Sequence, residues 1–306
     1  MKKEITIGLS LSREQRILLN SHSFLNLINV LADELHYLRE LAHRKEAFDG
    51  TLQVIKHIRH SLEDDSPAMI TPHQMQEFYS YIEQEIAAEV QEGHLSNEQK
   101  KKFNRSTDNI RSIFRIIHIR VRELMARSDE SETWTSHPIS QIMENLHGFL
   151  AAIEKNSKGS YRIVHSENHK EDSDYLITLQ IKSPDKKNIF MPPVVQDFLY
   201  DLIANARKYT RPGGCIHALL EEDPEKILFQ ITDTGIGIPE DEIEQVVTFG
   251  YRAGNAIDKK THGGGFGLTK AYYHTREMGG RMWIASTVSR GTTITIHIPK
   301  NSSDSV

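Results

Sequence analysis

The sequence contains a single cysteine, Cys215, among its 306 residues. One cysteine excludes an intrachain disulfide, and the composition has no other feature that points to secretion. No apolar run approaches the ~18 residues that a membrane-spanning helix needs. The charged start, residues 1–8, lacks the apolar core of a signal peptide. We therefore expect a soluble, cytoplasmic protein with no membrane segment.

An excess of basic charge is also missing. The formal net charge is -5, which argues against a general nucleic-acid binder. The sixteen histidines include no Cys/His cluster with the spacing of a zinc site, so most should lie on solvated helix faces. A chain of this length is long enough for two domains of ordinary size.

Glycine is scarce between residues 12 and 156, which indicates a helical region. The first helix should begin near Ser12, because the run from Ser12 to Gln15 fits a capping box. Its apolar residues are spaced alternately four and three apart, which is typical of an antiparallel bundle or a coiled coil. They are Ile17, Phe24, Ile28, Leu31, Leu35, Leu38 and Ala42, with Ser21 in the same register. Further helices are expected at about 51–62, 72–93, 96–127 and 139–155.

After Gly159 the pattern changes to strands mixed with helices, which predicts a two-layer α/β sandwich. The fold class is therefore an N-terminal helical bundle followed by an α/β domain. We expect the helical domain to cover 1–158, with extra helices at about 51–93, and the α/β domain to cover 159–300. Within the α/β domain, strands are expected at 161–165, 175–182, 215–221, 226–232, 281–287 and 292–299, and helices at 193–209, 240–247 and 266–278. The polar residues 301–306 should be disordered.

The first of three motifs in the α/β domain runs from Asp201 to Thr210 on a predicted helix. Asp201 and Asn205 are four residues apart and share a face. An amide oxygen suits Mg²⁺, a carboxylate one turn away can accept a proton, and Lys208 can neutralise a phosphate. Taken alone, the motif also fits a solvated helix face.

Two glycine-containing motifs follow. Asp233 ends an apolar strand and precedes Gly235 and Gly237, so its carboxylate can accept a hydrogen bond from an exocyclic amine while the glycines admit a flat base. The run from Gly263 to Leu268 comes just before a helix, and such a helix start attracts phosphate. It has neither the Walker nor the Rossmann spacing. Between these motifs, residues 249–262 would form a lid from which Arg252 can reach a γ-phosphate.

The order and spacing of the motifs carry a resemblance. Residues 191–299 resemble the ATP-binding domain of the GHKL superfamily, and most closely that of sensor histidine kinases. The three motifs match the N, G1 and G2 boxes, and Ser289 to Thr293 is similar to the closing Gly-Thr turn. The resemblance implies ATP and Mg²⁺ as cofactors, with Asn205 binding the metal, Asp233 the adenine amine and Lys208 a phosphate. It places around the nucleotide Tyr209, Gly235, Gly237, Arg252, Gly263, Gly265, Gly267, Leu268 and Thr292. Asp201 stands where relatives carry Asn, Glu or Asp, and we assign it a catalytic role.

A histidine kinase also needs a phosphoacceptor. His22 lies one step off the apolar seam, which is the row of apolar residues named above from Ile17 to Ala42, and it begins a stripe of polar residues. We therefore expect it to be exposed, with a pKa near the ordinary ~6.5. The segment is loosely similar to the H box of the family. Asn26, four residues on, matches the position that places water for dephosphorylation. Ser23 replaces the usual acidic residue and the usual proline is missing. The alternatives are a surface histidine on a dimerisation helix, or His36 or His118 as acceptor.

The resemblance therefore implies a two-component histidine kinase. It would phosphorylate His22, pass the phosphoryl group to a response regulator receiver domain, and form a homodimer through the helical domain. Its signal would come from an upstream sensor protein. The fifty residues between the seam helix and the long helix leave two interpretations open: an inserted input module, or a four-helix bundle in one chain, as in protein serine kinases of the pyruvate dehydrogenase kinase kind. The His22 segment favours the first. A nucleotide-sensing module without kinase activity is a further alternative.

Overall fold

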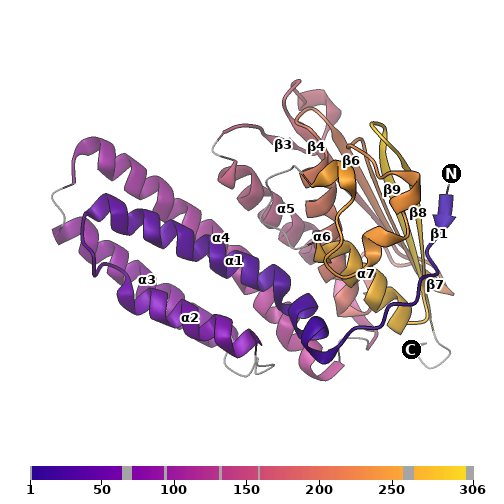
Figure 1. Ribbon diagram of the computed structural model, residues 1–306, viewed down its shortest axis with the longest axis horizontal. Helices are drawn as coiled ribbons and strands as arrows, with labels where there is room; N and C mark the ends of the chain where they lie inside the picture. The colour runs from indigo at the N-terminus through magenta and orange to yellow at the C-terminus, as the bar shows by residue number, and fades with distance from the viewer. Residues whose placement is uncertain are drawn as a thin grey trace.

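The computed structural model describes residues 2–63, 71–92, 95–130, 133–157, 159–257 and 265–300. An elongated set of helices lies beside a sheet covered by helices (Figure 1). This arrangement confirms the predicted fold class, a helical region followed by an α/β domain. Within the described residues, no helix combines the length and apolar character needed to cross a membrane.

The helical region contains four long helices. The predicted capping box is present, because the Ser12 hydroxyl accepts the Gln15 N–H at 3.2 Å and the Gln15 side chain accepts the Ser12 N–H at 2.9 Å. The helices are α1 (Arg13–Ala42), α2 (Asp49–Glu63), α3 (Pro72–Glu92) and α4 (Asn97–Glu130). Helix α1 begins next to the predicted Ser12, and the predicted spans of the other three helices agree with these bounds except that α4 ends slightly later than expected.

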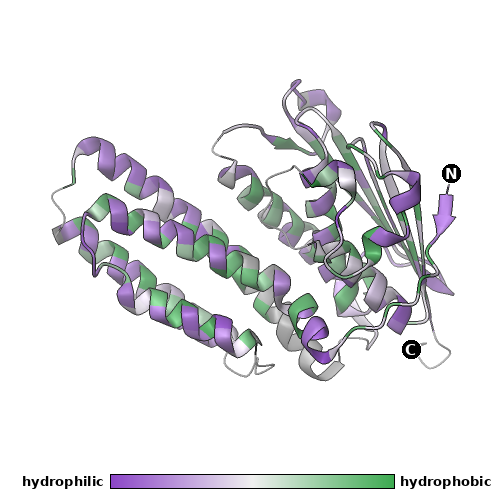
Figure 2. Cartoon of the chain, in the orientation of Figure 1, coloured by the Kyte–Doolittle hydropathy of each residue, from purple (hydrophilic) through white to green (hydrophobic). Residues whose placement is uncertain are grey.

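The apolar seam of α1 is covered within the same chain. Phe24, Ile28, Leu31, Leu35 and Leu38 are each at most 1% exposed. They belong to one hydrophobic core with residues of α2, α3 and α4, and apolar residues recur along each of these helices (Figure 2). The four helices therefore form a bundle in one chain, which is the arrangement that the heptad spacing left open.

The α/β domain is built on a seven-stranded sheet with the order β1-β8-β9-β7-β6-β4-β3. Strands β3, β4 and β6 are parallel to one another, and the remaining pairs are antiparallel. Three helices pack on one face of the sheet and share its core (Figure 1). The strands are β1 (Lys2–Glu4), β3 (Ile163–Val164), β4 (Tyr175–Lys182), β6 (Cys215–Glu222), β7 (Lys226–Asp233), β8 (Arg281–Thr287) and β9 (Gly291–Pro299), and the helices are α5 (Ile139–Asn156), α6 (Pro193–Tyr209) and α7 (Phe266–Glu277).

Several features differ from the sequence-based expectation. Lys2–Glu4 adds an edge strand to the sheet, and β2 (Thr135–Pro138) pairs with β5 (Asn188–Met191). Helix α5 contributes Ile142 and Leu146 to the core of the sheet, so the α/β body includes residues that the expected boundary at 158 assigned to the helical domain. An amphipathic pattern shows that a helix has a buried face but not which body covers it. The expected helix at 240–247 is two short 3-10 turns, η3 (Glu240–Glu242) and η4 (Gln245–Val247). Residues 301–306 lie outside the described part of the chain.

Candidate functional site

Helix α6 supplies one wall of a pocket. Pro193 stands in its first turn, where a missing backbone N–H costs nothing. Asp201 and Asn205 lie one turn apart, and Asn205 lines the pocket. Gly267 of α7 lies against the Asn205 amide so closely that a Cβ at this position would collide with Nδ2. The glycine therefore lets the start of α7 approach α6 at the point where the sequence predicts a phosphate site.

Asp233 stands at the end of β7 and also lines the pocket. Burial raises the pKa of its carboxyl to about 6, and backbone hydrogen bonds from Gly235 and Thr292 partly oppose this rise. The Gly235 N–H donates to Oδ1 at 2.7 Å. A desolvated carboxylate with unused acceptor capacity favours a ligand that donates a hydrogen bond. The predicted role for Asp233, which is to accept from an amine, fits this environment.

The pocket between these walls has a volume of about 110 Å³ and a largely apolar lining. The apolar residues are Leu202, Ala206, Ile231, Ile236, Ile238, Val246, Ala253, Ala256 and Ile294. The structure also brings together here eight of the residues that the sequence analysis placed around a nucleotide, namely Asn205, Tyr209, Asp233, Gly237, Arg252, Gly265, Leu268 and Thr292. Of the remaining ones, Gly235 and Gly267 adjoin the pocket through Asp233 and Asn205. Gly263 lies outside the described residues.

Arg252 lines the pocket, and Lys208 of α6, which is not one of the lining residues, lies close enough to Arg252 to be affected by its charge. Burial, followed by the nearby charges of Arg252 and Arg207, lowers the pKa of Lys208 to about 8. Cations crowded in this way are stabilised when an anion binds between them. The pocket therefore joins an apolar slot, an acceptor carboxylate and nearby cationic groups, which suits a base linked to phosphates. Asn205 offers an amide oxygen to Mg²⁺, an ion that keeps waters and phosphate oxygens as its other ligands. Among the described residues, no group of three or more His, Cys, Asp and Glu side chains could itself hold a metal ion.

His22 lies beside this pocket, and its expected exposure is wrong. The ring is half-buried and packs edge-on against Phe266 of α7, with ring centroids 4.5 Å apart. Burial lowers the pKa of His22 to about 4. Asp201 opposes this shift, whereas Lys270, Lys208 and Arg252 reinforce it. The imidazole is therefore neutral at physiological pH, and it faces the α/β domain of its own chain.

The other acceptor-related predictions are placed less fully. Asn26 lies one turn after His22 on α1, but its side chain is outside the described part, as is that of His118 on α4. His36 is exposed on α1. Of the two candidate histidines whose side chains are described, His22 lies near the nucleotide-type pocket and His36 does not.

Sequence reasoning missed some residues of this region. Lys270 is buried in the middle of α7 and contacts Asp201, and a lysine within a helical pattern carries no sequence signal of burial. Tyr251 and Asn255 line the pocket, and Asn255 Nδ2 donates to the Gly237 carbonyl at 2.9 Å. They belong to the irregular segment after η4, whose path only the tertiary structure defines.

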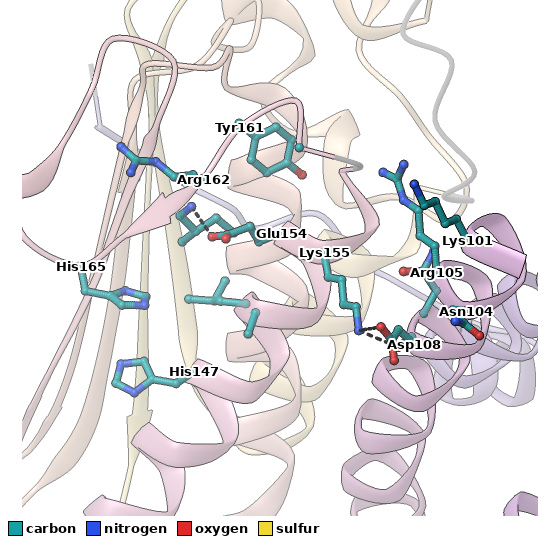
Figure 3. A pocket seen from close by; sticks show the side chains of 15 residues that line it. Lys101, Asn104, Arg105, Asp108, His147, Glu154, Lys155, Tyr161, Arg162 and His165 are labelled. Atoms are coloured by element: carbon teal, nitrogen blue, oxygen red, sulfur yellow. Dashed lines mark hydrogen bonds and ion pairs between the residues drawn. The ribbon is translucent and has the colours of Figure 1, made fainter. Parts of the chain in front are cut away.

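A larger groove, of about 720 Å³, lies between α4 and α5 (Figure 3). Lys101 and Arg105 of α4 face it, and Lys155 of α5 donates to the Asp108 carbonyl at 2.9 Å across it. Glu154, which also lines the groove, accepts the Ile163 N–H through its carboxylate at 2.6 Å. None of the three sequence motifs contributes to this groove, so the lining, rather than the volume, identifies the smaller pocket as the candidate active site.

Comparison with known proteins finds similarity over part of the chain. Residues 192–302 match the family described as "Histidine kinase-, DNA gyrase B-, and HSP90-like ATPase". Among curated proteins, the chain is 34% identical over 109 residues to the circadian input-output histidine kinase CikA of Synechococcus elongatus. It is 35% identical over 107 residues to the sensor histidine kinase WalK of Bacillus subtilis. It is also 35% identical over 109 residues to the adaptive-response sensory kinase SasA of S. elongatus.

These matches cover 34–36% of this chain and only 14–28% of the three relatives. Among solved structures, the catalytic domain of the histidine kinase ThkA aligns with 55% of this chain and 97% of its own, at a TM-score of 0.39 and 18% identity. The sequence similarity to this ATPase family therefore concerns residues 192–302, and the activity of the whole chain is a matter for inference from the site.

Proposed function

We propose that residues 192–302, as a domain of the histidine kinase-, DNA gyrase B- and HSP90-like ATPase family, serve an ATP-dependent protein histidine kinase that phosphorylates His22. The observation that carries this proposal is the packing of His22 on Phe266 at the start of α7, where the charges of Lys208 and of the pocket residue Arg252 reach the ring. The similarity to CikA, WalK and SasA, which are named as kinases, supports the same reaction type.

In this proposal, different residues bind different parts of ATP. Asp233 accepts from the adenine amine, and the apolar walls hold the base. Lys208, Arg252 and the backbone around Gly265 and Gly267 would bind the phosphates, and Asn205 would hold Mg²⁺ through its amide oxygen. Bound Mg²⁺ neutralises phosphate charge. Because these groups hold the nucleotide in one orientation, its γ-phosphate end points to the side of the pocket where His22 lies.

His22 is suited to be the nucleophile. A ring with a pKa of about 4 keeps its lone pair at neutral pH. As the N–P bond forms, the bond between the γ-phosphorus and the bridging oxygen breaks and ADP leaves. The imidazole gains positive charge during this step, which the nearby Asp201 carboxylate stabilises until the ring proton is lost to solvent. Phosphoryl transfer of this kind depends mainly on positioning and charge neutralisation.

The phosphoryl group then passes to an aspartate of a response regulator receiver domain, and Asn26 supports the reverse phosphatase reaction. Because His22 packs on its own ATPase domain, the receiver can reach it only after α1 and α7 separate. An upstream sensor protein that binds the bundle would control this step. We place the protein in the cytoplasm, where ATP and receiver domains occur. The seam of α1 is covered within its own chain, so a homodimer would form through outer faces of the bundle. Light scattering measures whether the protein is a dimer.

The test is incubation with γ-labelled ATP. Wild type should gain acid-labile, alkali-stable label, and both His22→Gln and Asn205→Ala should lose it. His36→Gln is the matched control, because it removes an exposed histidine from the same helix, and it should keep the label. Label that survives in His22→Gln would show that another residue is the acceptor.

A second candidate function is a protein serine kinase of the pyruvate dehydrogenase kinase kind. The observation that favours it is the four-helix bundle formed within one chain. In that case Asp201 would act as the base toward a serine hydroxyl, and His22 would be its neighbour rather than the acceptor. Acid-stable label on an added protein, with none on His22, would support this candidate. Nucleotide binding without any label would instead support a nucleotide-sensing module.

A further inference from the structure

Lys270 forms a buried ionic cluster with two carboxylates of α6. Its ammonium lies 2.7 Å from Asp197 Oδ2 and 2.9 Å from Asp201 Oδ2. The side chains of Lys270 and Asp197 are 2% and 1% exposed, and that of Asp201 is 11% exposed. Asp197 and Asp201 are one helical turn apart, so the lysine bridges two carboxylates on the same face of α6.

Burying this charged cluster costs free energy that an apolar side chain would not cost. Removing an ammonium and two carboxylates from water costs several kcal/mol per ion, and buried ion pairs seldom stabilise a protein more than apolar side chains of similar volume. An apolar residue at position 270 would also fill the space between α6 and α7. The charge on Lys270 therefore indicates a role other than packing, and buried charge clusters beside a pocket often mark functional sites.

Lys270 belongs to a face of α7 that points at the start of α1. Phe266, one turn before Lys270, packs on His22, and His274, one turn after, lies 3.2 Å from the Asn20 side chain. The three residues are spaced four apart, so they lie along one side of the helix. Lys270 is thus the central residue of a strip that joins α7 to the helix that carries His22.

We propose that Lys270 is the positioning residue of the phosphotransfer site: it fixes the Asp201 carboxylate beside His22 through the shared contact with Asp197. This inference rests on the proposed function, since it concerns the rate at which His22 is phosphorylated. Lys270 acts through Asp201 and does not line the nucleotide pocket. Its loss should therefore slow the chemical step and leave nucleotide binding almost unchanged.

The charge of Lys270 also affects His22. The charged groups that act on this ring are Asp201 and Lys208 of α6, Lys270 of α7, and Arg252 after η4. Lys270 lowers the pKa of His22, whereas Asp201 raises it. Without the ammonium, His22 should keep its proton up to a higher pH. Because protonated His22 cannot attack, the fall of the phosphorylation rate at low pH, which is the acid limb of the pH–rate profile, should move to higher pH. A lysine that only filled space, without its charge reaching His22, would not move this limb.

The experiment compares Lys270→Met with Arg276→Met, which removes an exposed cation from the same helix. In Lys270→Met, the single-turnover labelling rate at saturating ATP should fall about 100-fold, and the ATP dissociation constant should stay within about twofold of wild type. Arg276→Met should match wild type. Lys270→Arg, which keeps the charge, should recover part of the rate and the original acid limb.

A second variant separates positioning from folding. Lys270→Met leaves two buried carboxylates that repel each other, whereas Lys270→Met with Asp197→Asn removes one of these charges and should bind nucleotide normally. If the double variant is still slow, the positioning role is supported. Wild-type rate and acid limb in the double variant would overturn it. His22→Gln in the same series separates the two inferences, because label surviving in that variant refutes His22 as acceptor whatever the lysine variants do.

Discussion

The raised pKa of Asp233 predicts that nucleotide affinity depends on pH. The carboxyl has a pKa of about 6 because it is buried, and its ionised form is a much stronger acceptor for the adenine amine than its protonated form. At pH 7.5 about 97% of this group is ionised, and at pH 5.0 about 9%. The apparent dissociation constant should therefore rise about tenfold over this range, which corresponds to about 1.4 kcal/mol.

Calorimetric titration with a non-hydrolysable ATP analogue at the two pH values measures this change. The nucleotide phosphates and nearby cations titrate as well, so Asp233→Asn is the reference. The variant should bind about 10- to 100-fold more weakly at pH 7.5, because it loses a hydrogen bond to a charged acceptor. Its dissociation constant should then change about tenfold less between the two pH values than that of wild type.

The sign of the effect is specific. Burial raises the pKa of the unbound carboxyl, and a ligand that donates to it lowers this pKa again. Binding of such a ligand therefore weakens as the pH falls through the pKa of the unbound protein. Equal pH dependence in wild type and Asp233→Asn would refute the assignment of Asp233 as the acceptor. Tighter binding at low pH in wild type alone would show that the protonated carboxyl donates instead.

Three further predictions follow from particular contacts. In the nucleotide-free protein, NMR titration should place the midpoint of His22 at about 4, lower still in Asp201→Asn and higher in Lys270→Met, and a midpoint near ~6.5 would contradict the packing against Phe266. Gly267→Ala should push the Asn205 amide aside and lower kcat/KM for labelling about 100-fold, whereas Gly148→Ala, whose added carbon meets nothing within 4 Å, should be neutral; equal activity of the two variants would count against the predicted role of Asn205. Leu31→Ala in the bundle core should cost about 2–5 kcal/mol of unfolding free energy in urea denaturation, and a loss below about 0.5 kcal/mol would mean that the seam is not covered as described.

Most of the local structure could be predicted because it depends on local chemistry. The capping box at Ser12, the heptad seam of α1 and the alternation in β7 each depend on residues close together in the chain. The pocket residues were predictable for a related reason, because Asn205, Asp233 and Gly267 stand in short motifs whose order and spacing are specific. The irregular segment after η4 carries no such pattern, so the contributions of Tyr251 and Asn255 could not be predicted.

What the sequence determined by itself is therefore most of the helices and strands and the motifs of an ATP-type pocket, because periodicity, caps and motif spacing act over a few residues. Only the tertiary structure decided which surfaces meet. It paired β1 with β8 some 280 residues away, folded the seam of α1 into a single-chain bundle, and packed His22 against Phe266. It also buried Lys270 between Asp197 and Asp201. Burial and contacts between distant segments set the protonation state of His22, and no local pattern along the chain encodes them.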